Sequence, residues 1–163
     1  MGFICLIFLV CFSLVNPVYT QSWDSYIDYL IAQTKDASGT EHADQACIIG
    51  LDGGAKWTTD GHANAYKLTT SEATDIAVSF KSEDFSAFMA SGIQAEGVQY
   101  QFLREDEVNT GLLVLGKLKD HGAITMQSSK TAIVIAHTIE GEMQGNTNKG
   151  VAVIAEYLES LGM

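Results

Sequence analysis

The spacing of apolar residues changes several times along the chain, and each change marks a predicted element. After Ser22, apolar side chains recur at helical spacing while Asp24 and Asp28 fall on the opposite face, which predicts a first helix that ends near residues 38–39. The C-terminal segment "NKGVAVIAEYLESLGM" has the same spacing and predicts a last helix. The two apolar stripes are Trp23, Tyr26, Ile27, Leu30 and Ile31, and Val151, Ile154, Ala155, Leu158 and Leu161.

Shorter elements are predicted between residues 46 and 91. "ACIIGLDG" followed by "AKWTT" predicts a hairpin of two short strands, because the glycines of the turn adopt positive φ at low cost. "TSEATDIAVSF" and "SEDFSAFMAS" each place a Ser or Thr before acidic residues, which is typical of a helix start. We expect a short helix in each of these two segments.

From Gly97 onward the pattern has the period of strands. The segments "VQYQFLRED", "GLLVLGKL", "GAITMQSS" and "TAIVIAHTI" are separated by polar or glycine-bearing turns and predict a meander. The order is therefore helix, hairpin, two helices, about four strands and a helix. The chain has a single proline and no linker, so this order predicts one α+β domain over residues 22–163 with a central antiparallel sheet.

Residues 1–21 form a hydrophobic leader that we set apart from this domain. Its apolar run of about 13 residues, Phe3 to Val15, is short for a membrane span and has the length of a signal-peptide core. However, no basic residue precedes the run, and the body of the chain contains one cysteine, Cys47, as expected for a reducing compartment. Two alternatives stay open: a secreted protein, or a cytoplasmic protein with an alternative or extended N-terminus.

The charge of the chain limits its partners. The 163 residues include 20 acidic and 9 basic residues, for a formal net charge of -11, which argues against a nucleic-acid ligand. All basic residues lie beyond residue 34, and four of them, in the last third, could form a local basic face for a protein partner: Lys117, Lys119, Lys130 and Lys149.

Motifs for catalysis are scarce. "GLLVLGKL" at residues 111–118 matches the phosphate-binding loop G-x-x-x-x-G-K-[ST] except at Leu118, which cannot ligate magnesium, and its apolar spacer is typical of a buried strand. Cys47 lies in an apolar run, as a buried thiol does. The histidines have no metal-binding spacing: His42, His62, His121 and His137. We expect a binding protein, with no catalytic residue, cofactor or metal.

Four aromatic residues form the best candidate for a site: Trp23, Tyr26, Trp57 and Tyr157. Each alone is most simply a core residue. If the terminal helices lie side by side on the sheet, however, the four rings could line a shallow groove. Such a groove suits a polyproline II peptide, whose rings stack on aromatic faces and whose carbonyls accept hydrogen bonds from Trp and Tyr.

Three separated motifs resemble the profilin family. "SWDSYI" is similar to its opening Ser-Trp-x-x-Tyr, "CIIGLDGGAKWTT" to its hairpin with Ile-Ile-Gly-x-Asp-Gly-x-x-Trp, and "GNTNKGVAVIAEYLESLGM" to its terminal Gly-x-x-Asn-Lys helix with Tyr-Leu. The resemblance covers the chain from Ser22 to Met163. It implies a central antiparallel sheet with the N- and C-terminal helices on one face and two short helices on the other.

The resemblance also implies partners and site residues. It implies a cytoplasmic and cytoskeletal protein that binds monomeric actin, proline-rich peptides of actin regulators and phosphoinositide head groups, and that regulates actin polymerisation. The poly-proline positions are Trp23, Tyr26, Trp57, Tyr157 and Met163, the last standing where some members have Tyr. The actin positions are Arg104, Lys117, Lys119, Gly145, Asn148 and Lys149. Three positions depart from the Lys, Glu and His of some members: Gln99, Val153 and Met143.

Overall fold

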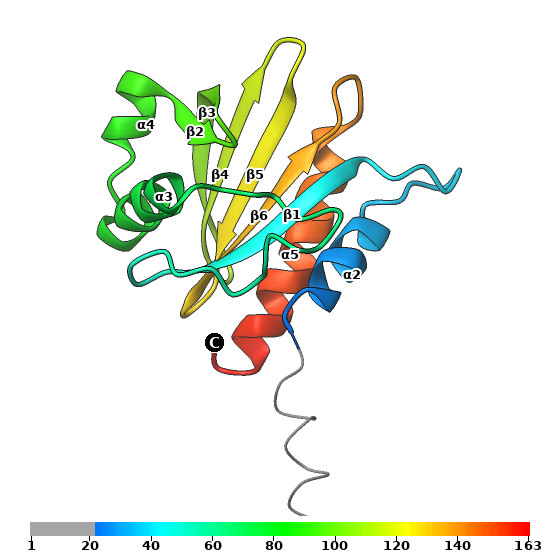
Figure 1. Cartoon of the computed structure of the whole chain (residues 1–163), viewed down its shortest axis with the longest axis horizontal. Helices are drawn as coiled ribbons and strands as arrows, with labels where there is room; N and C mark the ends of the chain where they lie inside the picture. Colours follow the sequence, from blue (N-terminus) through cyan, green and yellow to red (C-terminus); the bar gives the residue numbers. More distant parts are fainter. Residues whose placement is uncertain (1–21) are drawn as a thin grey trace, which may run out of the picture.

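A six-stranded antiparallel sheet forms the centre of the molecule, in the order β1-β6-β5-β4-β3-β2 (Figure 1). The computed structural model describes residues 22–163, so the prediction for residues 1–21 lies outside the described residues. The strands are β1 (Ala43–Gly50), β2 (Ile93–Ala95), β3 (Val98–Val108), β4 (Gly111–Leu118), β5 (Gly122–Ser128) and β6 (Ala132–Thr138). The helices are α2 (Ser25–Gln33), α3 (Thr70–Ser82), α4 (Ser86–Ser91) and α5 (Gln144–Ser160).

The helices cover the two faces of the sheet in pairs. The terminal helices α2 and α5 lie side by side on one face, and α3 and α4 lie on the other (Figure 1). Strand β6 contributes to both cores, because successive side chains of a strand point to opposite faces. Ala132, Val134 and Ala136 face α2 and α5, whereas Ile133 and Ile135 face α3 and α4. The predicted α+β fold is confirmed.

The two terminal helices approach each other closely at Gly150 of α5. A Cβ atom at this position would lie 2.7 Å from Thr34 Cγ2 and 2.9 Å from the Leu30 carbonyl oxygen, both at the end of α2. Because glycine has no Cβ, the backbones can pack at this separation. The close contact holds the outer surfaces of α2 and α5 next to each other, and the candidate groove lies on those surfaces.

Helix α3 begins at a capping box, as its sequence predicted. The Thr69 hydroxyl accepts a hydrogen bond from the Glu72 amide at 3.1 Å, and the Glu72 carboxylate accepts one from the Thr69 amide at 2.9 Å. The Glu72 carboxylate also accepts hydrogen bonds from the amides of Glu96 and Gly97, in the turn between β2 and β3. One buried side chain therefore caps α3 and fastens it to a turn that is distant in sequence.

Several predicted features differ from the structure. The segment "SEDFSAFMAS" does not start a helix at Ser82, which is the last residue of α3; α4 begins at Ser86 without a side-chain cap. The predicted hairpin is present in part. The chain turns back antiparallel to β1 through one bridge, Ile49 to Lys56, and the Gly50 and Trp57 amides donate to the Ala55 and Ile48 carbonyls, but this return forms no second strand, and β1 pairs along its length with β6.

The first helix ends at Gln33 instead of near residue 38, because the Thr34 hydroxyl donates to the Ile31 carbonyl and accepts from the amides that start β1. The three-residue strand β2 was not predicted.

Among residues 22–163, none of the helices has both the length and the apolar composition needed to cross a membrane.

Candidate functional site

The four predicted aromatic residues meet on one surface, which we call the aromatic surface. The Trp23 ring lies 5.1 Å from the Tyr26 ring and 5.1 Å from the Trp57 ring, between ring centroids, at tilts of 37° and 40°. The Tyr26 ring lies 5.9 Å from the Tyr157 ring at a tilt of 31°. The rings therefore form a continuous row, at separations typical of attractive aromatic pairs.

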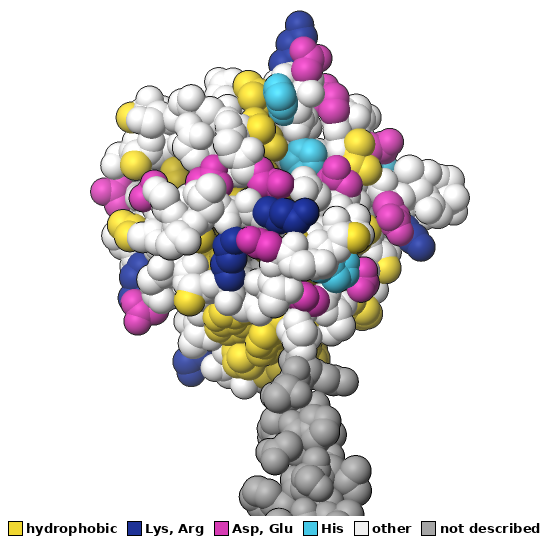
Figure 2. Space-filling view, in the orientation of Figure 1, with side chains coloured by type: hydrophobic (Ala, Val, Ile, Leu, Met, Phe, Trp, Pro, Cys, Tyr) yellow, Lys and Arg dark blue, Asp and Glu magenta, His cyan; other side chains and the backbone are white. Residues whose placement is uncertain are grey.

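The row is built on the core under the terminal helices. Trp23, Tyr26 and Trp57 are half-buried against that core, so one side of each ring is fixed by packing and the other faces solvent. Tyr157 is 46% exposed. Hydrophobic side chains gather at the end of the molecule where α2 begins and α5 ends, as Figure 2 shows. An exposed apolar patch of this kind marks a binding surface.

A carboxylate connects the two segments that carry the tryptophans. The Asp24 side chain, beside Trp23, accepts hydrogen bonds from the Thr59 amide at 2.6 Å and the Thr59 hydroxyl at 2.5 Å. Burial opposes ionisation of Asp24, but these hydrogen bonds outweigh it and hold the pKa of Asp24 below its ordinary value. The Trp57 amide donates to the Ile48 carbonyl at 2.9 Å. Trp57 is therefore anchored to both β1 and α2.

Sequence reasoning did not identify Asp24 and Thr59 as supports of the site. They are 35 residues apart, and no local pattern joins them. The only sequence signal is an acidic residue directly after the first tryptophan, which is also the ordinary composition of a helix start.

Met163, which the resemblance implied as a poly-proline position, lies against the core that supports the aromatic rings. Its backbone is held at both ends, because the Met163 amide donates to the Leu158 carbonyl at 2.9 Å and its carbonyl accepts from the Lys130 amide at 3.1 Å. The C-terminal residue thus has a fixed place beside the groove, although a thioether offers no flat ring for stacking.

A hollow of about 420 Å³ extends the aromatic surface between α2 and α5. Its lining residues are Ser25, Tyr26, Tyr29, Val153, Ile154 and Tyr157. Burial, and then the neighbouring Tyr157, raise the pKa of Tyr26, so its hydroxyl stays protonated and can donate a hydrogen bond. Tyr29 was not predicted as a site residue. Its spacing of three residues from Tyr26, on the exposed side of α2, is the signal that could have identified it.

The residues predicted for actin binding lie at the opposite end of α5. The strand register places Arg104 opposite Leu115, and Leu115 opposite Thr125. The Thr125 hydroxyl donates to the Asn148 side-chain oxygen at 2.6 Å. The face of the sheet that carries Arg104, Leu115 and Thr125 is therefore the face that α5 covers. Lys117 lies two residues from Leu115 and therefore points to the same face. Gly145 and Lys149 are exposed in the first turns of α5, and Lys119 is exposed in the turn after β4.

Charges on this second surface are sparse and mixed. The Arg104 guanidinium contacts the Asp106 carboxylate at 3.1 Å, in an exposed ion pair that contributes little to stability. Of the three departing positions, Met143 is exposed at the start of α5, Val153 lines the hollow, and the Gln99 amide donates to the Ser91 carbonyl. Figure 2 shows Lys and Arg side chains scattered among acidic ones on the face in view.

The sites that the sequence analysis discounted stay without catalytic geometry in the described part of the chain. Residues 111–118 form β4, so their amides are paired in the sheet and cannot cradle a phosphate. Cys47 is buried, and burial raises the pKa of its thiol, which keeps it unreactive. Residues 22–163 contain no group of three His, Cys, Asp or Glu side chains that could hold a metal ion.

Comparisons with known proteins give one consistent result. The profilin family model matches residues 21–163. A profilin of Clypeaster japonicus is 72% identical over 142 residues, which cover 87% of this chain and 99% of that protein. The crystal structure of Acanthamoeba castellanii profilin II is similar with a TM-score of 0.67 at 25% identity, covering 87% of this chain and 100% of that one. Mouse profilin IIa in complex with a double repeat from the FH1 domain of mDia1 has the same fold, with a TM-score of 0.63 at 21% identity and coverage of 88% and 100%.

Proposed function

The chain belongs to the profilin family, and from that premise we propose that it binds monomeric actin and proline-rich peptides and thereby regulates actin polymerisation. It acts by binding and has no catalytic role. The aromatic surface takes the proline-rich ligand. The surface around Arg104, Lys117, Lys119, Gly145, Asn148 and Lys149 takes actin.

The observation that carries the proposal is the continuous row of rings from Trp57 through Trp23 and Tyr26 to Tyr157. A polyproline II helix has three residues per turn and no internal hydrogen bonds, so it presents flat rings and free carbonyls along its length. Half-buried aromatic rings accept the prolines by stacking, while the indole N–H and phenol O–H groups donate to the carbonyls. Such a peptide loses little conformational entropy, because it is extended before it binds.

The distance between the two surfaces supports simultaneous binding of both ligands. Gly145 and Tyr157 are 12 residues apart on α5, which at 1.5 Å per residue separates them by about 18 Å along the helix. A protein that carries actin on one surface and a peptide on the other could deliver actin monomers to proline-rich regulators.

Peptide binding is tested by titrating tryptophan fluorescence with a poly-proline peptide. Protein beginning at Ser22 suits this test, because a relative of the same extent is a whole protein. Trp23→Ala should weaken peptide binding by about 2 kcal/mol, as expected for a central aromatic anchor, and leave actin binding nearly unchanged. No fluorescence change and no retention on a poly-proline column would refute the aromatic surface as a peptide site.

Actin binding is tested by charge reversal. Arg104→Glu together with Lys149→Glu should weaken the actin complex by about tenfold, because charges at an interface rim steer association. The matched control is Lys67→Glu with Lys81→Glu, which makes the same charge change away from the surface. If wild-type protein at high molar excess left actin polymerisation unchanged, this half of the proposal would be lost.

Cytoplasm and cytoskeleton are the proposed place of action, in keeping with the buried free thiol of Cys47. The alternative is a secreted binding module with an extracellular proline-rich or other ligand, and it requires residues 1–20 to act as a signal peptide. Mass spectrometry of the native N-terminus, with assay of the culture medium, separates the two. We do not extend the proposal to phosphoinositides, because the chain carries 9 basic against 20 acidic residues, and anionic head groups are bound by clusters of basic ones.

A further inference from the structure

Most of the outer edge of β3 has no strand beside it. Strand β2 pairs with β3 over residues 98–100, and β4 pairs with the other edge over residues 101–108. Among the described residues, no backbone hydrogen bond is made to the outer edge of residues 101–108. Gly92 ends the covered part: its backbone has a φ of 77°, and a Cβ there would lie 2.6 Å from the Tyr100 carbonyl oxygen. On the side of β3 where β2 lies, the backbone beyond Tyr100 therefore has no neighbouring strand.

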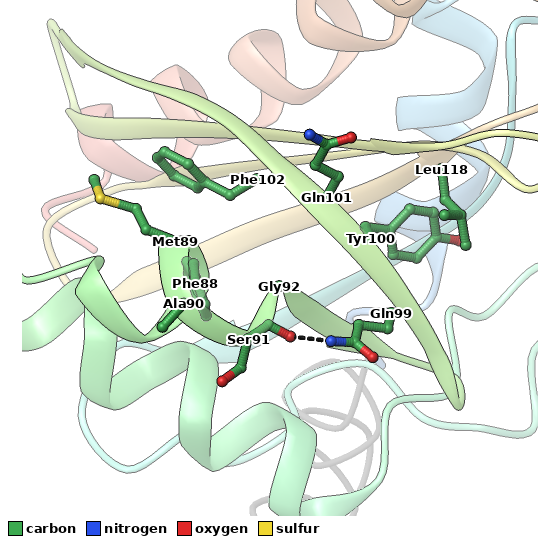
Figure 3. A pocket seen from close by; sticks show the side chains of 10 residues that line it. All are labelled: Phe88, Met89, Ala90, Ser91, Gly92, Gln99, Tyr100, Gln101, Phe102 and Leu118. Atoms are coloured by element: carbon green, nitrogen blue, oxygen red, sulfur yellow. Dashed lines mark hydrogen bonds between the residues drawn. The ribbon is translucent and has the colours of Figure 1, made fainter.

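A hollow with a mixed polar and apolar lining lies at the start of this open edge, and Met89 and Phe102 form an apolar end of it. Its volume is about 460 Å³, and α4 and β3 form its walls (Figure 3). Met89 of α4 and Phe102 of β3 face each other across one end of it, and Met89 is 60% exposed. An exposed methionine beside a half-buried phenylalanine is an adaptable apolar contact for an incoming side chain.

An acidic hollow of about 330 Å³ lies farther along the same edge. Glu105 and Glu107 of β3 form one side of it, and Glu83 at the end of α3 forms another. Glu105 and Glu107 lie on the same face of the strand about 7 Å apart, because they are two residues apart. Like charges at this spacing repel each other in the free protein.

The apolar end of the first hollow and the acidic hollow are in register along β3. Leu103 is the extra residue of a bulge, so Phe102, Glu105 and Glu107 lie opposite Gly116, Val114 and Leu112. These three positions of β4 are two residues apart, and the three side chains of β3 therefore recur at the period of one face of a strand.

We propose that the open edge of β3 binds an extended basic segment of another protein by adding it as an antiparallel strand in the row of β2. The added strand places an apolar side chain between Met89 and Phe102 and two basic side chains next to Glu105 and Glu107. In its own N-to-C direction it carries the pattern basic-x-basic-x-apolar. Backbone hydrogen bonds supply affinity, and the alternate side chains supply specificity.

Charge excludes a second copy of this chain as the occupant. Pairing β3 with β3 of another molecule would bring the glutamates of both strands together, in a protein with a formal net charge of -11. Opposed like charges and a bulge are the features by which natural edge strands avoid self-pairing. A basic segment removes the repulsion at Glu105 and Glu107 instead of adding to it.

Two synthetic peptides of one composition test the proposal: Thr-Lys-Thr-Lys-Thr-Ile-Thr, and the same residues in reverse order. Calorimetry with the full chain should give binding of the first peptide that is about tenfold tighter than that of the second, because the reversed order cannot satisfy both hollows in an antiparallel strand. Hydrogen exchange of the complex should show added protection of backbone amides in residues 101–108. Substitutions at exposed positions locate the site without disturbing the core.

Met89→Glu and the pair Glu105→Lys with Glu107→Lys should each weaken binding of the first peptide by about tenfold. The control pair, Glu156→Lys with Asp75→Lys, makes the same charge change on exposed helical positions and should leave binding unchanged. Three results would overturn the proposal: no binding at peptide concentrations of about 1 mM, equal binding of the two peptides, which indicates charge attraction alone, or binding without protection of β3.

Discussion

The two faces of the sheet are built from side chains of different size, although β6 contributes to both. Under α2 and α5 the sheet presents small residues, including Ala46, Ala132 and Ala136. Under α3 and α4 it presents large ones, including Ile49, Ile124 and Met126, and these pack against an aromatic group formed by Phe80, Phe85 and Phe88.

This difference accounts for the different uses of the two faces. Small side chains let the two terminal helices lie close to the sheet and to each other, so their outer surfaces meet beside a continuous row of aromatic rings. Large side chains fill the space between the sheet and α3 and α4, and most of the β3 edge on this side stays without a partner strand. The comparison predicts that stability and peptide binding can be changed separately.

The largest effect is expected on the face with large residues. Ile135→Ala removes a fully buried side chain and should lower the free energy of unfolding by about 2–5 kcal/mol, because the cavity cannot fully collapse. Urea denaturation measures this loss. Ile135 points away from α2 and α5, so the folded fraction should bind a poly-proline peptide with unchanged affinity. A loss of affinity as large as that of Trp23→Ala would contradict the independence of the two faces.

A smaller but coupled effect is expected between the terminal helices. Gly150→Ala places a methyl group against the Leu30 carbonyl and should cost about 1–3 kcal/mol of stability, partly offset by the better helix propensity of alanine. The same methyl group should push α2 away from α5, separate Tyr26 from Tyr157, and weaken peptide binding about threefold.

Gly145→Ala is the matched control in the same helix, because no atom lies within 4 Å of the added Cβ. It should leave both stability and peptide affinity close to those of the wild type. Equal behaviour of the two variants in denaturation and peptide titration would mean that close approach at Gly150 does not hold the groove together.

The sequence predicted the longer elements, and the structure confirmed α2, α5 and β3 to β6. Not every member of the predicted stripes belongs to them: Trp23 precedes α2, and Leu161 follows α5 and is 51% exposed. β5 is buried along its whole length and does not alternate. β2 was missed because three residues are too few to show a period. The turn predicted at Gly53 and Gly54 is present, but the second strand of the hairpin is not. Gly54 also allows this loop to press against α3, with the Ala73 carbonyl 2.5 Å from a Cβ at that position.

The site was predictable to a similar extent. The four rings could be identified because large aromatics near both ends of the domain are informative once the terminal helices are placed together. Their supports could not be identified, because the Asp24 to Thr59 contact and the close approach at Gly150 depend on tertiary geometry. The open edge of β3 could not be predicted from the sequence either, because it is left open where the unpredicted strand β2 begins, at Ile93.

A third effect, on the dependence of stability on pH, is expected from the face with large residues. His137 of β6 lies beside the Tyr66 and Tyr100 rings, with Nδ1 2.6 Å from the Asp44 carboxylate and Nε2 2.6 Å from the His121 carbonyl. Burial alone would lower the pKa of His137, but these two acceptors outweigh it and raise the pKa.

Because the folded protein binds this proton more tightly than the unfolded chain, the His137 contribution is fully present below the unfolded pKa of about 6.5 and is lost as pH rises through the folded pKa. The free energy of unfolding, measured by urea denaturation, should therefore be lower at about pH 8 than at about pH 5.5, and Asp44→Asn should reduce this difference. Parallel pH profiles for wild type and variant would exclude the contact with Asp44 as its source.

The smallest effect on stability is expected at Asp24, and it should fall on the face with terminal helices alone. Asp24→Ala removes both hydrogen bonds to Thr59 at a solvent-accessible position, so the cost in unfolding free energy should be about 1 kcal/mol or less. The loop that carries Trp57 then loses its tie to α2, and the Trp23 and Trp57 rings are no longer held at a fixed separation. Fluorescence titration with a poly-proline peptide should show about threefold weaker binding, because ordering the loop now opposes association.

Asp60→Ala is the control, since it removes an exposed ion pair with Lys56 in the same loop without touching α2. If both variants bind the peptide as the wild type does, packing against the core is enough to position Trp57 and the carboxylate tie is dispensable.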